Sequence, residues 1–193
     1  MIAAALPLLI RLANFTSSSE PIKSTLPIGE TEKLISEFDY ERIFVSPEFL
    51  KEKSALEDIK NPSRIVVGAA NKSLKGINNY LSLFSCKNII VTSPKEAEAI
   101  KLFSNAYLAT RLSFFNELDS LAKEIGFDSK QVIEGMGYDP RIGNTYNQVS
   151  DGWGGSCLPK DTQELSSLLK ENDLNLLDEV IISNKKRKSK NNK

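Results

Sequence analysis

The sequence predicts an α/β region followed by an all-α region, and three observations lead to this fold class. Between residues 21 and 92, short runs of β-branched and aromatic residues alternate with helix-like segments. After Pro94 the chain contains neither proline nor glycine as far as Ile125, and its apolar residues recur with the helical period. The composition, 40% hydrophobic and 26% charged over 193 residues, is that of a globular protein with one or two small domains.

We expect a first domain over residues 1–92, in which residues 1–20 are atypical: an apolar start runs into a Thr/Ser cluster that is typical of a turn or linker. From Pro21 the order of elements is strand, helix, strand, strand, helix, strand, which predicts a mainly parallel sheet. The expected ranges are 22–25, 31–38, 42–46, 64–68, 73–84 and 87–92.

A helical domain is expected over residues 93–184, with a basic tail at 185–193. Ser93, Pro94 and Glu96 together form a capping-box start, so a helix of about 30 residues and about 45 Å should run to Ile125. Its apolar residues spread widely around the helix, which favours burial in a subunit interface. Asp128 should cap a second helix that ends near residues 135–137, and further helices should begin near residue 157 and cover 175–183.

Charge and composition exclude several classes of function. The last nine residues hold six of the 25 basic groups, so residues 1–184 carry 19 basic against 25 acidic groups, which argues against a nucleic-acid partner. The apolar start is too short to span a bilayer and has no basic residue before it, so neither a membrane span nor a signal peptide is expected. Two cysteines that lie 71 residues apart indicate no disulfide framework or zinc site and fit a reducing cytoplasm. The absence of histidine excludes Ser-His-Asp and Cys-His catalysis.

The stretch Gly154–Asp161 places Cys157 between a glycine-rich loop and the start of a helix, with Pro159 in its first turn. A helix N-terminus and the nearby Lys160 both favour the reactive thiolate form of a cysteine. Asp161 lies one helical turn from the thiol. The alternative is a buried, inert cysteine in front of a capped helix.

Four further polar residues are candidates for a site. Lys101 and Asn105 share one face of the long helix, although a solvated stripe beside Glu98 explains them equally well. Thr25 and Glu48 each end a strand at the presumed carboxyl edge of the sheet, where open α/β sheets bind ligands. For either residue alone, a turn or a helix cap is the competing interpretation.

The motifs together resemble the UDP-glucose/GDP-mannose dehydrogenase family. They occur in the family's order over residues 21–188: Ser24–Gly29, Ser46–Glu52, Glu98-x-x-Lys101-x-x-x-Asn105, Asn116–Glu117, Asp139–Gly143 and Gly152–Asp161. The resemblance implies the C-terminal part of a Rossmann-like NAD-binding domain joined to a helical dimerisation domain. It also implies two-step, NAD-dependent oxidation of the C6 alcohol of a UDP-sugar to a carboxylate, through a thiohemiacetal and a thioester on Cys157.

The resemblance also implies roles for the other residues. Lys101 and Asn105 would stabilise the oxyanion, Asp161 would handle protons, and Thr25 and Glu48 would hold and activate a water molecule. Substrate contacts are implied for Lys101, Asn105, Phe49, Leu50, Glu52, Arg141, Tyr146, Trp153 and Gly154, and cofactor contacts for Thr25, Glu52 and Lys160. Arg141 would reach the partner subunit's site in a homodimer formed through the long helix.

The sequence departs from the family pattern at both ends. A full family member starts with a strand and a GxGxxG loop, and neither precedes Ser24 here. It also continues into a third domain, whereas this sequence stops at Lys193. We therefore expect an internal piece of a family member that binds NAD weakly or not at all and is inactive on its own. Two hypotheses stay open: a family enzyme with its catalytic residues in place, and an inactive fragment that retains only dimerisation.

Overall fold

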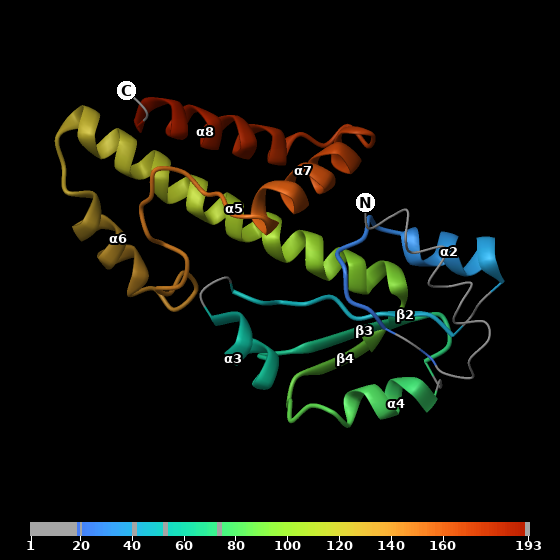
Figure 1. The fold of residues 1–193 in the computed structure, drawn as a ribbon. Coiled ribbons are helices and arrows are strands. Elements are labelled where there is room, and N and C mark those ends of the chain that lie inside the picture. The colour runs from blue at the N-terminus through green and yellow to red at the C-terminus, as the bar shows by residue number, and fades with distance from the viewer. Residues whose placement is uncertain (1–18, 20, 40–41, 52–53, 73–74, 192–193) are drawn as a thin grey trace. The chain divides into compact units, whose positions relative to one another are not determined.

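The computed structural model describes residues 19, 21–39, 42–51, 54–72 and 75–191 (Figure 1). Most of the atypical segment 1–20 and the start of the helix expected at 73–84 lie outside these residues. The chain forms two compact units, residues 1–101 and 102–193. The division falls inside the long helix α5 (Pro94–Ile125), which contributes its first turns to one unit and the rest to the other.

The first unit contains a sheet of four strands in the order β1-β2-β3-β4. They are β1 (Pro21–Ile22), β2 (Phe44–Val45), β3 (Ile65–Ala69) and β4 (Ile89–Thr92). The β1–β2 and β3–β4 pairs are parallel, as expected, whereas β2 and β3 run antiparallel. The mainly parallel sheet is thus confirmed, although β1 ends before the expected residues 23–25.

Three helices accompany this sheet: α2 (Glu30–Phe38), α3 (Ala55–Lys60) and α4 (Lys75–Leu81). The sequence predicts α2 and α4, but it misses α3, whose six residues are too few to show a period. Side chains of the strands alternate between the two faces, so Phe44, Ile65 and Val67 pack with Ile77 of α4. Val45 and Val66 pack with Ala97 of α5 on the other face.

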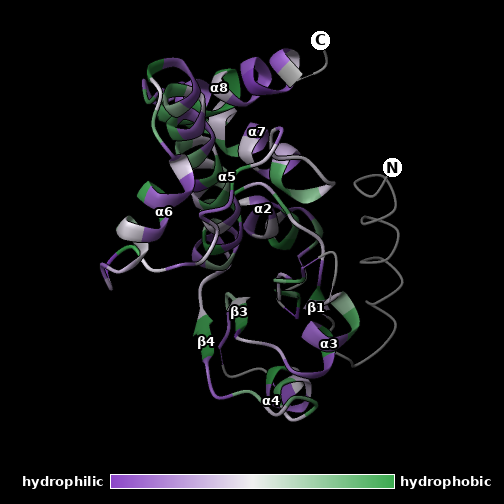
Figure 2. Ribbon diagram, turned by 90° about the vertical axis from the view of Figure 1, so that its left-hand side faces the viewer, coloured by the Kyte–Doolittle hydropathy of each residue, from purple (hydrophilic) through white to green (hydrophobic). Residues whose placement is uncertain are grey.

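A glycine lets α5 approach the sheet closely. A Cβ atom added to Gly68 of β3 would lie 2.5 Å from the Cβ atom of Ala97, so only a residue without a side chain fits there. By contrast, β4 is poorly covered: Ile89, Ile90 and Val91 are all exposed, although Figure 2 colours β3 and β4 alike as hydrophobic.

The second unit contains the rest of α5 together with α6 (Ser129–Gly137), α7 (Cys157–Lys170) and α8 (Leu176–Asn191). The expected start of α6 is confirmed, since the Asp128 side chain accepts hydrogen bonds from the amides of Lys130 and Gln131. The last helix differs from the prediction, because α8 continues beyond Ser183 through most of the basic run. Lysine is a good helix former and is favoured near a helix C-terminus, which explains the extension.

Several apolar side chains of α5 remain exposed in this single chain: Phe103, Tyr107, Phe114, Leu121 and Ile125. We call this set the α5 stripe. In the part of the chain that the structure describes, no helix has the length and the apolar composition that crossing a membrane requires.

Candidate active site

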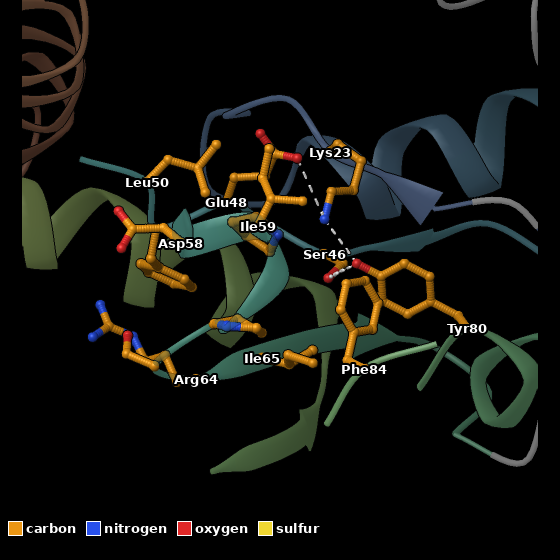
Figure 3. Close-up of a pocket in the computed structure, with 14 residues that line it drawn as sticks. Lys23, Ser46, Glu48, Leu50, Asp58, Ile59, Arg64, Ile65, Tyr80 and Phe84 are labelled. Carbon is orange, nitrogen blue, oxygen red and sulfur yellow. Dashed lines mark hydrogen bonds and ion pairs between the residues drawn. The ribbon is translucent and has the colours of Figure 1, made fainter. Parts of the chain in front are cut away.

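The first unit has a cavity of about 240 Å³ beside the carboxyl ends of β1 and β2 (Figure 3). Residues 46–50 follow β2 and form one wall, and α3, α4 and the start of β3 supply the others. The lining is mostly apolar, with two residues of each charge: Lys23, Arg64, Glu48 and Asp58. This is the edge at which open α/β sheets bind ligands.

Lys23 connects the polar groups of this cavity. Its Nζ atom donates to Tyr80 Oη at 2.8 Å and lies 3.5 Å from Glu48 Oε1. Tyr80 Oη is also 2.9 Å from Ser46 Oγ, and its ring packs edge-on against Phe44 of the core. Figure 3 shows Lys23 between the Glu48 carboxylate and the Tyr80 hydroxyl. Glu48 therefore reaches into the cavity beside an ammonium group that is held in place by a rigid aromatic residue.

Phe49 contacts two cations. The Arg64 guanidinium lies 3.9 Å from its ring centroid, and Lys101 Nζ lies 5.5 Å from it. Such stacking is favourable for a cation against an aromatic face, and burial lowers the pKa of Arg64. Lys101 Nζ also donates to the backbone oxygen of Glu48 at 2.7 Å. Lys101, which is itself buried, thus holds the segment that follows β2.

Glu98 anchors the segment that follows β1. It is 1% exposed, and its two carboxylate oxygens accept from the Gly29 amide at 2.6 Å, the Thr31 amide at 2.9 Å and the Thr31 hydroxyl at 2.6 Å. Gly29 is the N-cap of α2 and offers no side chain, so Glu98 of α5 caps that helix from outside. Glu98 and Lys101 lie three residues apart, so one turn of α5 holds both segments that carry Thr25 and Glu48.

In the second unit, the residues around Asp161 form a compact polar cluster. Asp161 is buried, and its Oδ2 atom accepts from Asn105 Nδ2 at 2.5 Å. Its Oδ1 atom accepts from Lys160 Nζ at the same distance. Cys157 is the first residue of α7, its thiol is exposed, and its Sγ atom lies 3.6 Å from Ser156 Oγ. An exposed thiol and a fixed carboxylate therefore lie one helical turn apart on α7.

The glycine-rich loop before α7 is tightly held. Trp153 is 5% exposed, and its indole Nε1 donates to Ser113 Oγ at 2.8 Å. Tyr146 has a φ of 56° and packs against the apolar cluster that Trp153 forms with Ala109, Leu112 and Val180. Closure of these residues over a substrate stays a prediction, since in this structure Trp153 belongs to the interior of the unit.

The remaining predicted residues are spread over the surface or lie outside the described residues. The Arg141 side chain is largely exposed and pairs with Asp139 at 2.6 Å. Leu50 lines the cavity of the first unit, and Thr25 follows β1 in a partly exposed position. Glu52 lies outside the described residues.

Sequence reasoning misses several residues that organise these sites: Lys23, Arg64, Tyr80, Asn184 and Arg187. Their partners lie far away in the sequence, and no local spacing marks them. Glu98 had a weak signal, because it stands in the same motif as Lys101, but a helical glutamate is equally typical of a solvated face.

Each of the two units matches a domain of known proteins. Residues 21–84 match the NAD binding domain of the UDP-glucose/GDP-mannose dehydrogenase family, and residues 95–186 match that family's central domain. The architecture is therefore a dinucleotide-binding α/β domain followed by a helical central domain. The chain belongs to the UDP-glucose/GDP-mannose dehydrogenase family.

Individual relatives agree with this assignment. The UDP-glucose 6-dehydrogenase of Streptococcus pneumoniae is 44% identical over 176 residues, covering 86% of this chain and 45% of that protein. The enzyme of the same name from Campylobacter jejuni is 43% identical over 170 residues, covering 86% and 43%. A UDP-glucose dehydrogenase structure from Pyrobaculum islandicum matches with a TM-score of 0.77 at 37% identity, covering 86% of this chain and 40% of that one. The chain thus spans less than half the length of these relatives.

Proposed function

We propose that this chain takes part in the NAD-dependent oxidation of the C6 alcohol of a UDP-sugar to a carboxylate, with UDP-glucose as the first candidate substrate. The proposal is carried by one observation: the exposed thiol of Cys157 lies one helical turn from the buried carboxylate of Asp161, which accepts a hydrogen bond from Asn105. Relatives that bear the name UDP-glucose 6-dehydrogenase support the choice of substrate.

Covalent chemistry would take place on Cys157. Its thiolate adds to the aldehyde carbon produced by the first oxidation, which gives a thiohemiacetal. Loss of a second hydride from that carbon leaves a thioester, and water then cleaves the thioester to release the carboxylate and restore the thiol. In total two hydrides leave the carbon and one water molecule is consumed.

Acid–base and electrostatic work would fall to the polar residues. Asp161 would accept the proton of the hydroxyl or of the attacking water, because its carboxylate is oriented by Asn105 and Lys160. Lys101 and Asn105 would each donate to the developing oxyanion, the first as a cation and the second as a neutral amide. Glu48, held beside Lys23, would hold and activate the hydrolytic water together with Thr25.

We assign the binding of a nicotinamide dinucleotide to the carboxyl ends of β1 and β2. The partly exposed Thr25 follows β1, and Lys160 of α7, whose side chain is 55% exposed, would contact a phosphate group. When bound, NAD supplies a hydride acceptor, and the two hydrides require two NAD molecules in succession. Since Cys86 and Cys157 are both free thiols, a reducing compartment such as the cytoplasm suits the reaction.

A pair of cysteine variants tests the proposal. The purified chain is mixed with NAD and UDP-glucose, and the absorbance of reduced nicotinamide and the carboxylate product are measured. Where the wild type turns over, Cys86→Ser should do the same, and Cys157→Ser should give no carboxylate product. Cys86 is the matched control, because its thiol contacts backbone oxygens, those of Pro62 at 3.2 Å and Asn88 at 3.6 Å. Equal turnover by both variants would contradict the proposed role of Cys157.

The α5 stripe favours a second candidate function, which is homodimerisation without catalysis by this chain. Apolar side chains along one long helix are typical of a surface that a second copy covers. Light scattering of the wild type should give the mass of a dimer, and Phe114→Glu should give a monomer. Leu83→Glu places the same charge on an exposed leucine of the first unit and should leave the dimer intact. A dimer that shows no turnover would favour this second candidate.

A further inference from the structure

Asn184 of α8 pairs with the backbone of the glycine-rich loop. Its Oδ1 atom accepts from the Trp153 amide at 2.8 Å, and its Nδ2 atom donates to the Trp153 carbonyl oxygen at 3.0 Å. The amide thus satisfies both backbone groups of one residue, as a neighbouring strand would. Asn184 is 7% exposed, so both hydrogen bonds are shielded from water.

Arg187, one turn further along α8, holds the start of the same loop. Its Nε atom donates to the Ser150 carbonyl oxygen at 2.9 Å, and its Nη2 atom donates to Asp119 Oδ2 of α5 at 2.9 Å. From α5, Asn116 Oδ1 accepts from the Ser150 amide at 2.8 Å. The loop is therefore fixed at Ser150 by two helices and at Trp153 by Asn184.

Gly152, between these two anchors, shows how closely α8 approaches. Its φ is 119°, and an added Cβ atom would lie 3.0 Å from Asn184 Oδ1 and 2.6 Å from Lys188 Cγ. A side chain at this position would meet both backbone strain and a clash. The loop and α8 are fitted to each other at residue 152 as well as through hydrogen bonds.

We propose that Asn184 is a positioning residue that sets the place of Cys157, an inference that rests on the proposed function. Only Gly154, Gly155 and Ser156 separate Trp153 from Cys157, and Gly155 has a φ of 79°. Two glycines give the chain wide conformational freedom, so the first turn of α7, which carries Cys157, is held from its N-terminal side only if the residue before the glycines is fixed. The indole bond to Ser113 fixes the ring of Trp153, whereas Asn184 fixes its backbone.

Two substitutions at Asn184 distinguish the contributions of its two hydrogen bonds to the Trp153 backbone. Asn184→Leu removes both of them at similar volume. Asn184→Asp keeps the acceptor for the Trp153 amide but places an oxygen opposite the Trp153 carbonyl. Asn172→Leu is the matched control, since Asn172 is exposed and bonds only within its own turn, to Leu168. All variants carry Cys86→Ser, so that Cys157 alone can be labelled.

Two measurements are made well below the melting temperature. The first is amide hydrogen exchange, and the second is the fluorine NMR spectrum of a trifluoromethyl probe attached to Cys157. We expect exchange of residues 150–156 to rise about tenfold or more in Asn184→Leu, and by less in Asn184→Asp, because one or two shielded hydrogen bonds are lost. The single fluorine resonance of the Cys86→Ser parent should broaden or split in Asn184→Leu and stay unchanged in Asn172→Leu.

A purely structural role would have a different signature. It would lower the melting temperature and raise exchange evenly over α5, α7 and α8, with a single unchanged fluorine resonance, and that result would overturn the proposal. Neither readout needs NAD or a UDP-sugar. A wild-type chain without turnover therefore counts against the proposed function, while hydrogen exchange and the fluorine spectrum still test whether Asn184 positions Cys157.

Discussion

The two units hold their candidate residues in different ways. In the first unit, the segments after β1 and β2 are held through their backbones by side chains of α5, and the Lys23–Glu48 pair is partly open to solvent. In the second unit, the network consists of buried side chains from three helices, with Asp161, Asn184 and Arg187 all below a tenth exposed. Some of their partners are charged or amide side chains, and others are backbone groups of Ser150 and Trp153.

This difference determines what a single substitution should do. A buried charge that loses its partner keeps its desolvation cost, so breaking one pair in the second unit should affect the whole unit. An exposed pair such as Lys23–Glu48 is screened by water and contributes little stability by itself. The first unit should therefore respond mainly where a backbone group is left without an acceptor, as it would be around Glu98.

The largest effect is expected for Arg187→Met. This change removes the buried cation of Asp119, which keeps the exposed Lys123 and the Ser129 hydroxyl as partners, and it removes the donor to the Ser150 carbonyl oxygen. We expect the free energy of unfolding of the second unit to fall by about 3–5 kcal/mol. Urea unfolding followed by fluorescence of Trp153, the sole tryptophan, measures it. Lys186→Met, an exposed neighbour, should stay within about 0.5 kcal/mol of wild type. A comparable loss in both variants would contradict the contrast between the units.

Glu98→Gln should have the next largest effect, in the first unit. Glutamine keeps the shape of Glu98 but turns an NH₂ group toward one of three converging donors, so at least one buried N–H or O–H loses its acceptor. The cost is about 1–3 kcal/mol. Unfolding followed by circular dichroism and exchange of the Thr31 amide measure this cost. Glu96→Gln, on the exposed side of the same helix, is the control and should have little effect. Unchanged exchange at Thr31 would show that the cap contributes nothing.

Much of the fold can be predicted from local sequence. The long helix α5 is predictable because thirty residues without proline or glycine show a clear period, and α6 because Asp128 is a strong cap. The short α3 is not predictable, since fewer than two turns carry no periodic signal. The extent of α8 also escapes prediction, because the burial of Arg187 against Asp119 depends on a partner 68 residues away.

The residues of the candidate site likewise divide into those that local sequence predicts and those that it does not. Cys157 and Asp161 are found from their spacing at a helix start, since both belong to one local motif. Glu98 and Asn184 are not found, because a glutamate or asparagine on a helix has the same sequence signal whether it is solvated or buried. Their roles depend on backbone groups of Thr31 and Trp153, which are 67 and 31 residues away. Residues that hold a site are thus harder to predict than residues that form it.

The smallest expected effect is the pH dependence of the second unit. Burial raises the pKa of Asp119, but hydrogen bonds from Lys123, Ser129 and Arg187 outweigh it and lower the pKa to about 2 from the ordinary 3.8. Because the folded pKa is the lower one, the stabilisation is complete above about pH 4 and is lost as the pH falls toward about 2.

Acid titration of three proteins tests this assignment, with Trp153 fluorescence in urea as the readout. In the wild type, the ratio of folded to unfolded second unit should fall roughly tenfold over this range because of Asp119. Asp119→Asn should start from lower stability at neutral pH, since Arg187 loses its anion, and should lack that part of the acid loss. Asp173→Asn, at an exposed position, should titrate like the wild type. If Asp119→Asn keeps the full acid loss, another carboxylate is responsible, and the buried network of the second unit does not set its response to acid.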